Sequence, residues 1–299
     1  MPDHILDLSQ ERCRLGVDGS LLVIRREGRP DFRLRLDEIA SVCVSEPASS
    51  VSFRALGALA TAGAIVVVCD ERRAPAGMLM PLANHHAQTP RFHAQAALGV
   101  VRRKRLWRQV VKAKVRQQAA VLDAAGRDGT PLRGMMARVM SGDKSNVEAH
   151  AAGVYWPLLL GERFRRNHEE PGVNALLNYG YAILRSSMTR AICAAGLHPT
   201  LGLSHHHREN PFCLSDDLIE PYRPMVDWAV FRHLDRGGRR DLDPQTKSDL
   251  VAEIVQGVRT KVDQRTLFDV AARTARSLAG IVLGTRRQLF LPEWFPRGT

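Results

Sequence analysis

The stretch Asn84-His85-His86-Ala87-Gln88-Thr89-Pro90 divides the sequence into two parts of different character. It is polar and ends in proline, which is typical of a connecting segment. Before it, apolar residues come in short runs, whereas after it they recur with the period of an α-helix. We therefore predict an α+β fold: a small N-terminal β domain at residues 1–84, a linker at 85–90, and a larger all-α domain at 91–299.

The N-terminal part is predicted to open with a β-hairpin. Arg12 to Val17 and Ser20 to Arg25 alternate apolar and polar residues around Asp18-Gly19, a dipeptide that accepts the positive φ angles of a tight turn. One short helix is predicted at Val51 to Thr61, with Ser50 as its N-cap. Further strands are predicted at Phe32 to Leu36, Ile39 to Val44, Ile65 to Cys69 and Met78 to Leu82.

The C-terminal part is predicted to contain helices only. Arg91 to Ala125 is rich in Ala, Gln, Lys and Arg, which lose little free energy on entering a helix, and Gly126 ends it. Further helices are predicted at Leu132 to Met140, Val147 to Leu160, Val173 to Ala195, Leu218 to Leu234, Pro244 to Arg259 and Gln264 to Leu283.

Charge indicates a polyanionic partner. Lysine and arginine number 43 against 31 aspartates and glutamates, a formal net charge of +12, and no acid lies between Arg91 and Leu122. A solvated helix face is the alternative, but such clusters favour contacts with nucleic-acid phosphates. The predicted DNA-binding residues are Arg102, Arg103, Arg105, Arg108, Lys112, Arg163, Arg165 and Arg166.

Several protein classes are disfavoured by what the sequence lacks. It has no phosphate-binding loop, G-x-G-x-x-G, G-x-S-x-G or H-E-x-x-H motif, so nucleotide hydrolysis is not expected. Its five cysteines lack C-x-x-C spacing, which favours reduced thiols over disulfides or a zinc ribbon. No apolar run approaches the roughly 20 residues of a membrane span, and the N-terminus resembles no leader. We therefore expect a cytoplasmic protein without a membrane partner.

The densest group of polar residues runs from Ser204 to Pro224. Asp217 and Glu220 are three residues apart and share one face of a predicted helix that Ser215 can cap. A histidine from the preceding loop would complete an oxygen and nitrogen donor set for Mg²⁺ or Mn²⁺. The alternative is that these acids only cap the helix and that the three histidines form a solvated loop. Pro221 disfavours α geometry at Glu220, so the helix is expected to kink there or to begin again.

A second group of polar residues runs from Gly142 to Trp156. Asn146 can cap a helix there, and Glu148 falls in its first turn. A lone acid in a first turn usually serves only as a partner of the helix dipole. The residues alone therefore leave the role of Glu148 open.

Three stretches, taken together, resemble the CRISPR-associated adaptation integrase family, and most of all the compact form that accompanies type II systems. They are Gly142 to Ala152, Asn174 to Arg185, and Asn210 to Asp227. The resemblance implies that the catalytic metal ligands are Glu148, His205 and Glu220, and that Asp217 is a supporting acid.

The histidine ligand lies where this sequence departs from the family pattern. Relatives usually have Gly-Ile-His-His, whereas this sequence has Gly202-Leu203-Ser204 followed by three histidines. His205 precedes Glu220 by 15 residues, a spacing that resembles that of type II relatives, so His205 is the implied ligand. His206 is the alternative ligand.

The resemblance implies a metal-dependent DNA endonuclease and integrase that inserts spacers into a CRISPR array by 3′-hydroxyl transesterification. The implied cofactor is Mg²⁺ or Mn²⁺. The implied partners are double-stranded DNA (prespacer and repeat), a second copy bound through the N-terminal β domain, a small ferredoxin-like adaptation protein and the type II RNA-guided effector nuclease. Two other functions remain open: a non-catalytic architectural DNA-binding protein, and a zinc hydrolase that uses the triple histidine.

Overall fold

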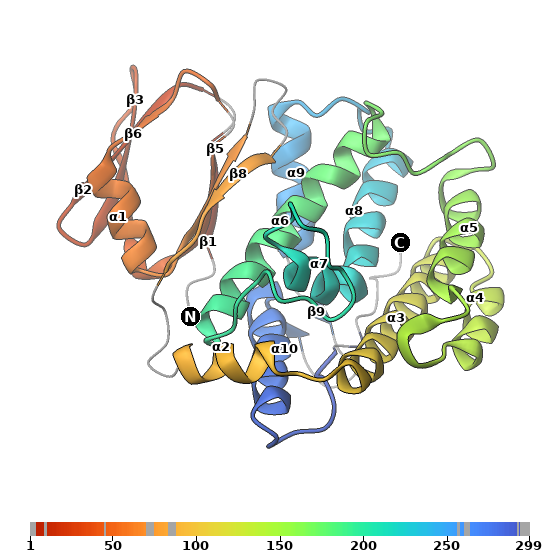
Figure 1. Ribbon diagram of the computed structural model, residues 1–299. Helices are drawn as coiled ribbons and strands as arrows, with labels where there is room; N and C mark the ends of the chain where they lie inside the picture. Colours follow the sequence, from red (N-terminus) through yellow and green to blue (C-terminus); the bar gives the residue numbers. More distant parts are fainter. Residues whose placement is uncertain are drawn as a thin grey trace.

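The computed structural model places a small β part beside a larger helical part (Figure 1). This confirms the predicted α+β class. The structure describes residues 4–8, 11–44, 46–69, 75–82, 88–255, 258–259, 264–291 and 293.

The β part contains two four-stranded sheets. One has the order β4-β3-β2-β6 and is antiparallel except for the parallel pair β2 and β6. The other has the order β1-β5-β7-β8, with β1, β5 and β7 parallel. The strands are β1 (His4–Leu8), β2 (Cys13–Asp18), β3 (Leu21–Arg26), β4 (Phe32–Arg35), β5 (Ile39–Val44), β6 (Ser50–Val51), β7 (Ile65–Cys69) and β8 (Pro75–Leu79).

The predicted hairpin is confirmed: β2 and β3 pair around a turn in which Gly19 has a φ of 57°. The short helix α1 (Phe53–Thr61) contributes Leu59 to a core shared with both sheets. Its predicted cap was wrong, because Ser50 belongs to β6. The side chain of Ser52 caps the helix instead and accepts a hydrogen bond from the Ala55 N–H at 3.2 Å.

The described residues of the C-terminal part are mainly helical. The helices are α2 (Gln88–Ala96), α3 (Val100–Ala124), α4 (Thr130–Met135), α5 (Val147–Leu160), α6 (Val173–Ala194), α7 (Cys213–Ile219), α8 (Arg223–Asp235), α9 (Pro244–Val255) and α10 (Leu267–Val282). Short 3₁₀ turns lie at Leu36–Glu38, Met136–Arg138, Ser141–Asp143 and Glu220–Tyr222, and β9 (Val258–Arg259) pairs with β10 (Gln264–Arg265). Across these described segments, no helix has both the length and the apolar character needed to cross a bilayer.

Several predicted helices differ from the structure. The long helix predicted from Arg91 is two helices, α2 and α3, and Gly99 is the N-cap of the second. Since α2 begins at Gln88, it includes the last part of the predicted linker, whose residues 85–87 lie outside the described chain. The all-helical prediction was also wrong for the small β9–β10 hairpin.

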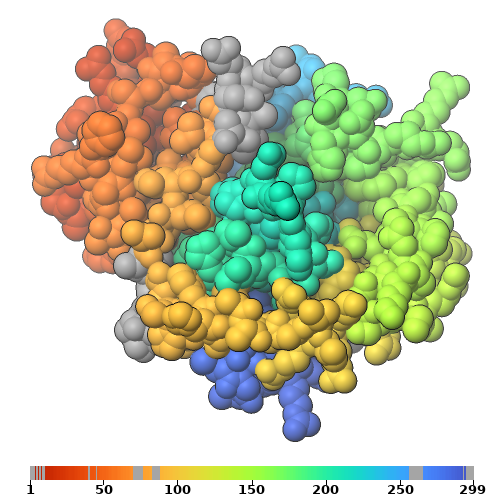
Figure 2. Space-filling view, viewed as in Figure 1, coloured from red at the N-terminus to blue at the C-terminus, as the bar shows by residue number. Residues whose placement is uncertain are grey.

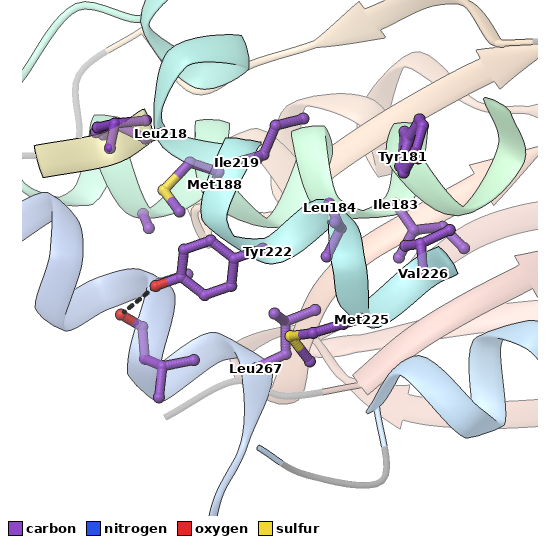
Figure 3. Packing of buried hydrophobic residues seen from close by; sticks show 14 of the residues in the cluster. Tyr181, Ile183, Leu184, Met188, Leu218, Ile219, Tyr222, Met225, Val226 and Leu267 are labelled. Carbon is purple, nitrogen blue, oxygen red and sulfur yellow. Dashed lines mark hydrogen bonds between the residues drawn. The ribbon is translucent and has the colours of Figure 1, made fainter. Parts of the chain in front are cut away.

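The helix α6 lies at the centre of the main core. It packs against α8, α10 and one face of the sheet that contains β5 and β7. A Cβ at Gly180 would lie 2.4 Å from a methyl carbon of Val226, so α6 and α8 approach closely only because glycine is there. Tyr222 anchors the neighbouring turn by sharing a 2.7 Å hydrogen bond with Thr274. Its ring lies among the buried apolar side chains of this core (Figure 3).

The segment around residues 200–215 is exposed at the centre of one face, with α2 and the start of α3 along its edge (Figure 2). This segment contains the three consecutive histidines. Their loop is therefore open to a large partner.

Candidate active site

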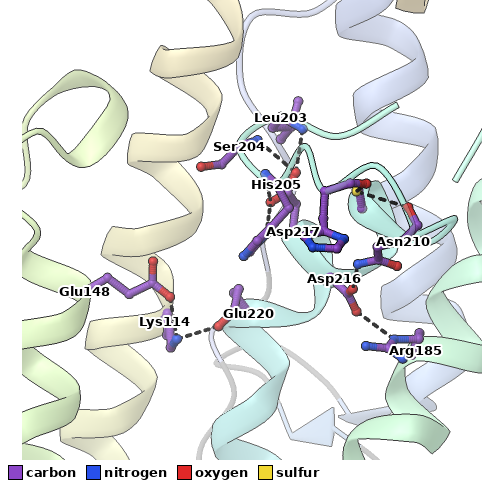
Figure 4. A network of polar contacts seen from close by, with 12 residues as sticks. Lys114, Glu148, Arg185, Leu203, Ser204, His205, Asn210, Asp216, Asp217 and Glu220 are labelled. Atoms are coloured by element: carbon purple, nitrogen blue, oxygen red, sulfur yellow. Dashed lines mark hydrogen bonds and ion pairs between the residues drawn. The ribbon is translucent and has the colours of Figure 1, made fainter. Parts of the chain in front are cut away.

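Side chains from three distant parts of the chain meet at Lys114 of α3. Its Nζ lies 2.6 Å from Oε1 of Glu148 on α5 and 2.5 Å from Oε2 of Glu220 (Figure 4). The side chains of Lys114, Glu148 and Glu220 are only 11%, 24% and 3% exposed. The structure thus brings the two predicted glutamates to one buried cation.

A cap by Asp143 positions Glu148. The carboxylate of Asp143 accepts hydrogen bonds from the backbone N–H groups of Val147 and Glu148, both at 3.0 Å. Asn146, the predicted cap, is in the left-handed region at φ 51° and its side chain makes no capping bond. The prediction was wrong because a residue three positions earlier satisfies the free N–H groups of α5.

A break between α7 and α8 positions Glu220. Pro221 is accommodated because Glu220 begins a 3₁₀ turn, after which α8 starts at Arg223. The predicted kink is therefore present as a change of helix type. The Arg223 Nε lies 3.1 Å from Oε1 of Glu220, so this carboxylate has a cation near each oxygen.

The buried carboxylate of Asp217 organises the histidine loop. It accepts hydrogen bonds from the backbone N–H groups of Leu203, Ser204 and His205 at 2.5, 2.9 and 3.2 Å. Its Oδ1 also lies 2.6 Å from the His205 Nδ1. A Cβ at Gly202 would come within 2.4 Å of the His205 carbonyl oxygen, so glycine is required for this tight turn. Asp217 therefore determines where the imidazole lies.

The electrostatics of the site are balanced between these groups. Burial alone would lower the pKa of Lys114, but the charges of Glu220 and Glu148 outweigh it and raise that pKa. Burial would raise the pKa of Glu220, but Arg223 and Lys114 outweigh it and hold that pKa below its ordinary value. The hydrogen bond to Asp217 raises the pKa of His205, and the charges of Glu220 and Glu148 add to this effect. All three groups favour their charged forms.

Ser215, the predicted N-cap of α7, does not cap it. Arg185 and Asn210 were not predicted as site residues, although both contact the neighbouring Asp216. Ser215 lies inside α7, where its hydroxyl shares a 2.8 Å hydrogen bond with Thr189. The neighbouring Asp216 is bound by Nε of Arg185 and by Nδ2 of Asn210, both at 2.7 Å. Arg185 and Asn210 lie in two of the stretches that carry the family resemblance.

Another buried carboxylate, that of Asp227, lies beside the site. Asp227 accepts hydrogen bonds from the hydroxyls of Tyr155, at 3.0 Å, and Tyr181. Burial raises its pKa to about 6, although both hydrogen bonds oppose the shift. The guanidinium of Arg223 lies 4.8 Å from the centre of the Tyr181 ring. Asp227 thus helps to fix the aromatic floor of a cavity of about 500 Å³ that Lys114 also lines.

Whether these residues fit a divalent ion depends on Lys114. Among the residues that the structure describes, no three His, Cys, Asp or Glu side chains are close enough to hold an ion as they stand. The donor types do fit, because two carboxylates and an imidazole suit Mg²⁺ or Mn²⁺. The ammonium also fits as a stand-in cation, since it already contacts one oxygen of each glutamate. Glu148, Glu220 and His205 are the residues that could hold an ion.

The basic residues of α3 do not form one stripe. Arg103 lines a cavity together with His205 and His206, whereas Arg102 and Arg105 line another cavity on a different side of α3. The side chain of Arg108 donates to the Val139 carbonyl at 2.9 Å, and Lys112 is half-buried.

The second basic cluster follows α5. Arg163 and Arg165 are exposed. Arg166 is half-buried and its guanidinium donates to Asn174 at 2.8 Å and to Asn178 at 2.6 Å. Arg165 and Arg166 line the same cavity as Lys114, so this cluster adjoins the site.

Comparison with known proteins gives consistent matches. The family model described as "CRISPR associated protein Cas1" matches residues 6–259. A CRISPR-associated endonuclease Cas1 from Neisseria meningitidis is 35% identical over 294 residues, covering 97% of this chain and 96% of that protein.

Two solved structures share the fold. A casposase bound to integration product aligns with a TM-score of 0.79 at 20% identity, over 96% of this chain and 92% of the other. A Cas6-RT-Cas1–Cas2 complex aligns with a TM-score of 0.78 at 16% identity, over 99% of this chain and 36% of the other.

Proposed function

Because the chain belongs to the Cas1 family of CRISPR-associated proteins, we propose that it is a metal-dependent DNA endonuclease and integrase that inserts new spacers into a CRISPR array. The observation that carries this proposal is that Glu148 and Glu220 share the ammonium of Lys114, while the charges of both glutamates act on the imidazole of the neighbouring His205–Asp217 pair. We place the reaction in the cytoplasm, where the chromosomal array of a prokaryote lies.

Each group at the site has a part in the proposed reaction. Glu148, His205 and Glu220 would hold Mg²⁺ or Mn²⁺, and the bound ion would supply a lower pKa for a DNA 3′-hydroxyl and positive charge beside the attacked phosphate. Asp217 keeps the His205 ring in one orientation through Nδ1, so Nε2 would be the nitrogen that binds an ion. Arg223 balances the charge of Glu220.

The chemistry is a transesterification. The 3′ oxygen of the incoming DNA bonds to a phosphorus atom in the repeat, and the bond from that phosphorus to the repeat's own 3′ oxygen breaks. The leaving oxygen takes up a proton in place of the one lost by the attacking hydroxyl. One phosphodiester replaces another, so nucleotide hydrolysis is not required.

The proposed partners follow from the family resemblance. They are prespacer and repeat DNA, a second copy of the chain bound through the N-terminal β domain, a small ferredoxin-like adaptation protein, and the type II RNA-guided effector nuclease. One of the two structural neighbours is a complex that contains Cas1 together with Cas2, which supports an assembly of this kind.

The decisive assay combines the protein with a supercoiled plasmid that carries a CRISPR repeat and with a labelled short duplex. We expect Mn²⁺-dependent transfer of the label to the plasmid, and complete loss of transfer when a chelator is in excess. Excess Mn²⁺ added after the chelator should restore transfer. DNA binding without any transfer would instead support an architectural DNA-binding protein, and dependence on zinc alone would support a zinc hydrolase.

The two faces of α3 give a prediction for DNA binding. We propose that Arg103, which shares a cavity with His205, contacts a phosphate near the site. Arg103→Gln should flatten the slope of log K against log salt by about 0.9, the contribution of one phosphate contact. The measurement is a salt titration of duplex binding by fluorescence anisotropy.

Arg105→Gln is the matched comparison, because Arg105 lies on the same helix but lines a different cavity. We expect a smaller change in slope. Equal flattening in both variants would show that DNA contacts both sides of α3, as the sequence pattern predicts. An unchanged slope in Arg103→Gln would show that the side near His205 does not contact duplex phosphates.

A further inference from the structure

Lys114 occupies the position between the two predicted carboxylate ligands. We propose that Lys114 is the resident cation of the metal-free site, and that a divalent ion binds by displacing its ammonium from Glu148 and Glu220. This inference rests on the proposed function, because it takes these two glutamates as metal ligands. It makes Lys114 a positioning residue that sets the metal concentration at which the enzyme becomes active.

The contacts define this role. The Lys114 Nζ lies 2.6 Å from Glu148 and 2.5 Å from Glu220, so one ammonium serves two carboxylates that come from different helical segments (Figure 4). In a buried site, two neighbouring carboxylates repel each other and need a cation between them. Arg223 contacts Glu220, while Glu148 has its described ion pair with Lys114. Lys114 therefore holds the two acids in place before a metal arrives.

A divalent ion would compete with the Lys114 ammonium because both bind carboxylate oxygens of Glu148 and Glu220. Mg²⁺ binds carboxylate oxygens at about 2.0–2.1 Å, so an ion shared by Glu148 and Glu220 would lie between them, where the ammonium lies now. Two cations cannot occupy that position together. A divalent ion must therefore replace the ammonium, and its binding is weakened by the energy of the two ion pairs that it breaks.

The structure also offers a place for the displaced side chain. Lys114 lines the cavity of about 500 Å³ that Tyr181 and Asp227 line as well. The flexible four-carbon stem of lysine can turn the ammonium into this space. Among the side chains that line it, Gln118, Asp227 and Tyr181 carry acceptor oxygens. Exchange then needs a change of rotamer and no movement of α3.

The first test is Mn²⁺ affinity measured by electron paramagnetic resonance on the full-length protein without DNA. Lys114→Met should bind Mn²⁺ about tenfold more tightly than wild type, because a competing charge at ion-pair distance has been removed. Its melting temperature without metal should fall, and Mn²⁺ should raise that temperature by more than it does in wild type.

Two variants serve as controls. Lys144→Met removes the same charge from an exposed residue four positions before Glu148, and its Mn²⁺ affinity should equal that of wild type. Lys114→Arg keeps a cation at the site and should show no gain in affinity. Equal or weaker Mn²⁺ binding by Lys114→Met would overturn the exchange, because it would show that the ammonium supports the ligands instead of competing with the ion.

A second measurement uses the wild-type chain, in case Lys114→Met does not fold. The sequence has six lysines, so a ¹⁵N spectrum selective for ammonium groups is simple. The signal assigned to Lys114 by its absence in Lys114→Arg should shift or vanish when Mg²⁺ is added. A signal that stays unchanged at saturating Mg²⁺ would overturn the inference.

The same Mn²⁺-binding measurements distinguish failure of the proposed metal site from failure of the Lys114 exchange. If wild-type protein binds no Mn²⁺, or if Glu148→Gln and Glu220→Gln bind it as wild type does, these acids are not metal ligands and the site assignment itself is wrong. If those variants lose Mn²⁺ while Lys114→Met binds it as wild type does, the metal site is supported and only the exchange fails.

Discussion

Replacement of Glu220 by glutamine is expected to abolish strand transfer while DNA binding is retained. A carboxylate that holds a catalytic ion contributes several kcal/mol of transition-state stabilisation, and about 1.4 kcal/mol corresponds to tenfold in rate, so we expect a loss of about a thousandfold or more. DNA binding should persist because Glu220 is buried and the basic residues around it are unchanged. The measurements are the plasmid transfer assay and fluorescence anisotropy with the same duplex.

The matched control is Glu209→Gln, which makes the same change at an exposed position on the histidine loop. It should keep transfer close to wild type. Because Glu220 also pairs with Lys114 and Arg223, the melting temperature of Glu220→Gln must be measured and the assay run well below it. Wild-type transfer by a folded Glu220→Gln would show that the proposed metal site is wrongly assigned.

His205→Ala is expected to reduce transfer by at least about a hundredfold, because even the residues that orient a metal-ligating histidine commonly contribute 10- to 100-fold. The structure supports His205 over His206 as the proposed ligand through contacts that the sequence does not show. Its Nδ1 is held by Asp217, and its ring lies edge-on to Trp107 at 5.7 Å between centroids. Transfer should be measured at several Mn²⁺ concentrations.

His206→Ala is the neighbouring control. His206 is exposed on the same loop and, within the described chain, has no ring contact of the kind that holds His205. Its replacement should reduce transfer only a few-fold, through DNA contacts. If His206→Ala lost more activity than His205→Ala, the ligand role would pass to His206 and the orientation of His205 by Asp217 would be a structural feature only.

Local patterns in the sequence were sufficient for most of the elements. The hairpin around Gly19 follows from alternation and a turn dipeptide, and α5 has the predicted bounds because its apolar spacing and its end at Gly161 are local signals. Predictions failed where the deciding contact came from elsewhere. Ser50 is not a cap because it pairs with Arg14 as part of β6. Ser215 is not a cap because it is buried inside α7 and hydrogen-bonded to Thr189.

The α+β class and the net positive charge could be predicted from the sequence alone. The three stretches that resemble the adaptation integrase family also led to the candidates Glu148, His205, Asp217 and Glu220. How these residues are arranged in space depends on the packing of distant parts of the chain. Lys114 lies in the basic, acid-free stretch from Arg91 to Leu122, yet its ammonium contacts two acids that are 34 and 106 residues away along the chain. Such a contact depends on how α3, α5 and the turn after α7 pack around a common core, and no local pattern of charge or periodicity encodes that packing.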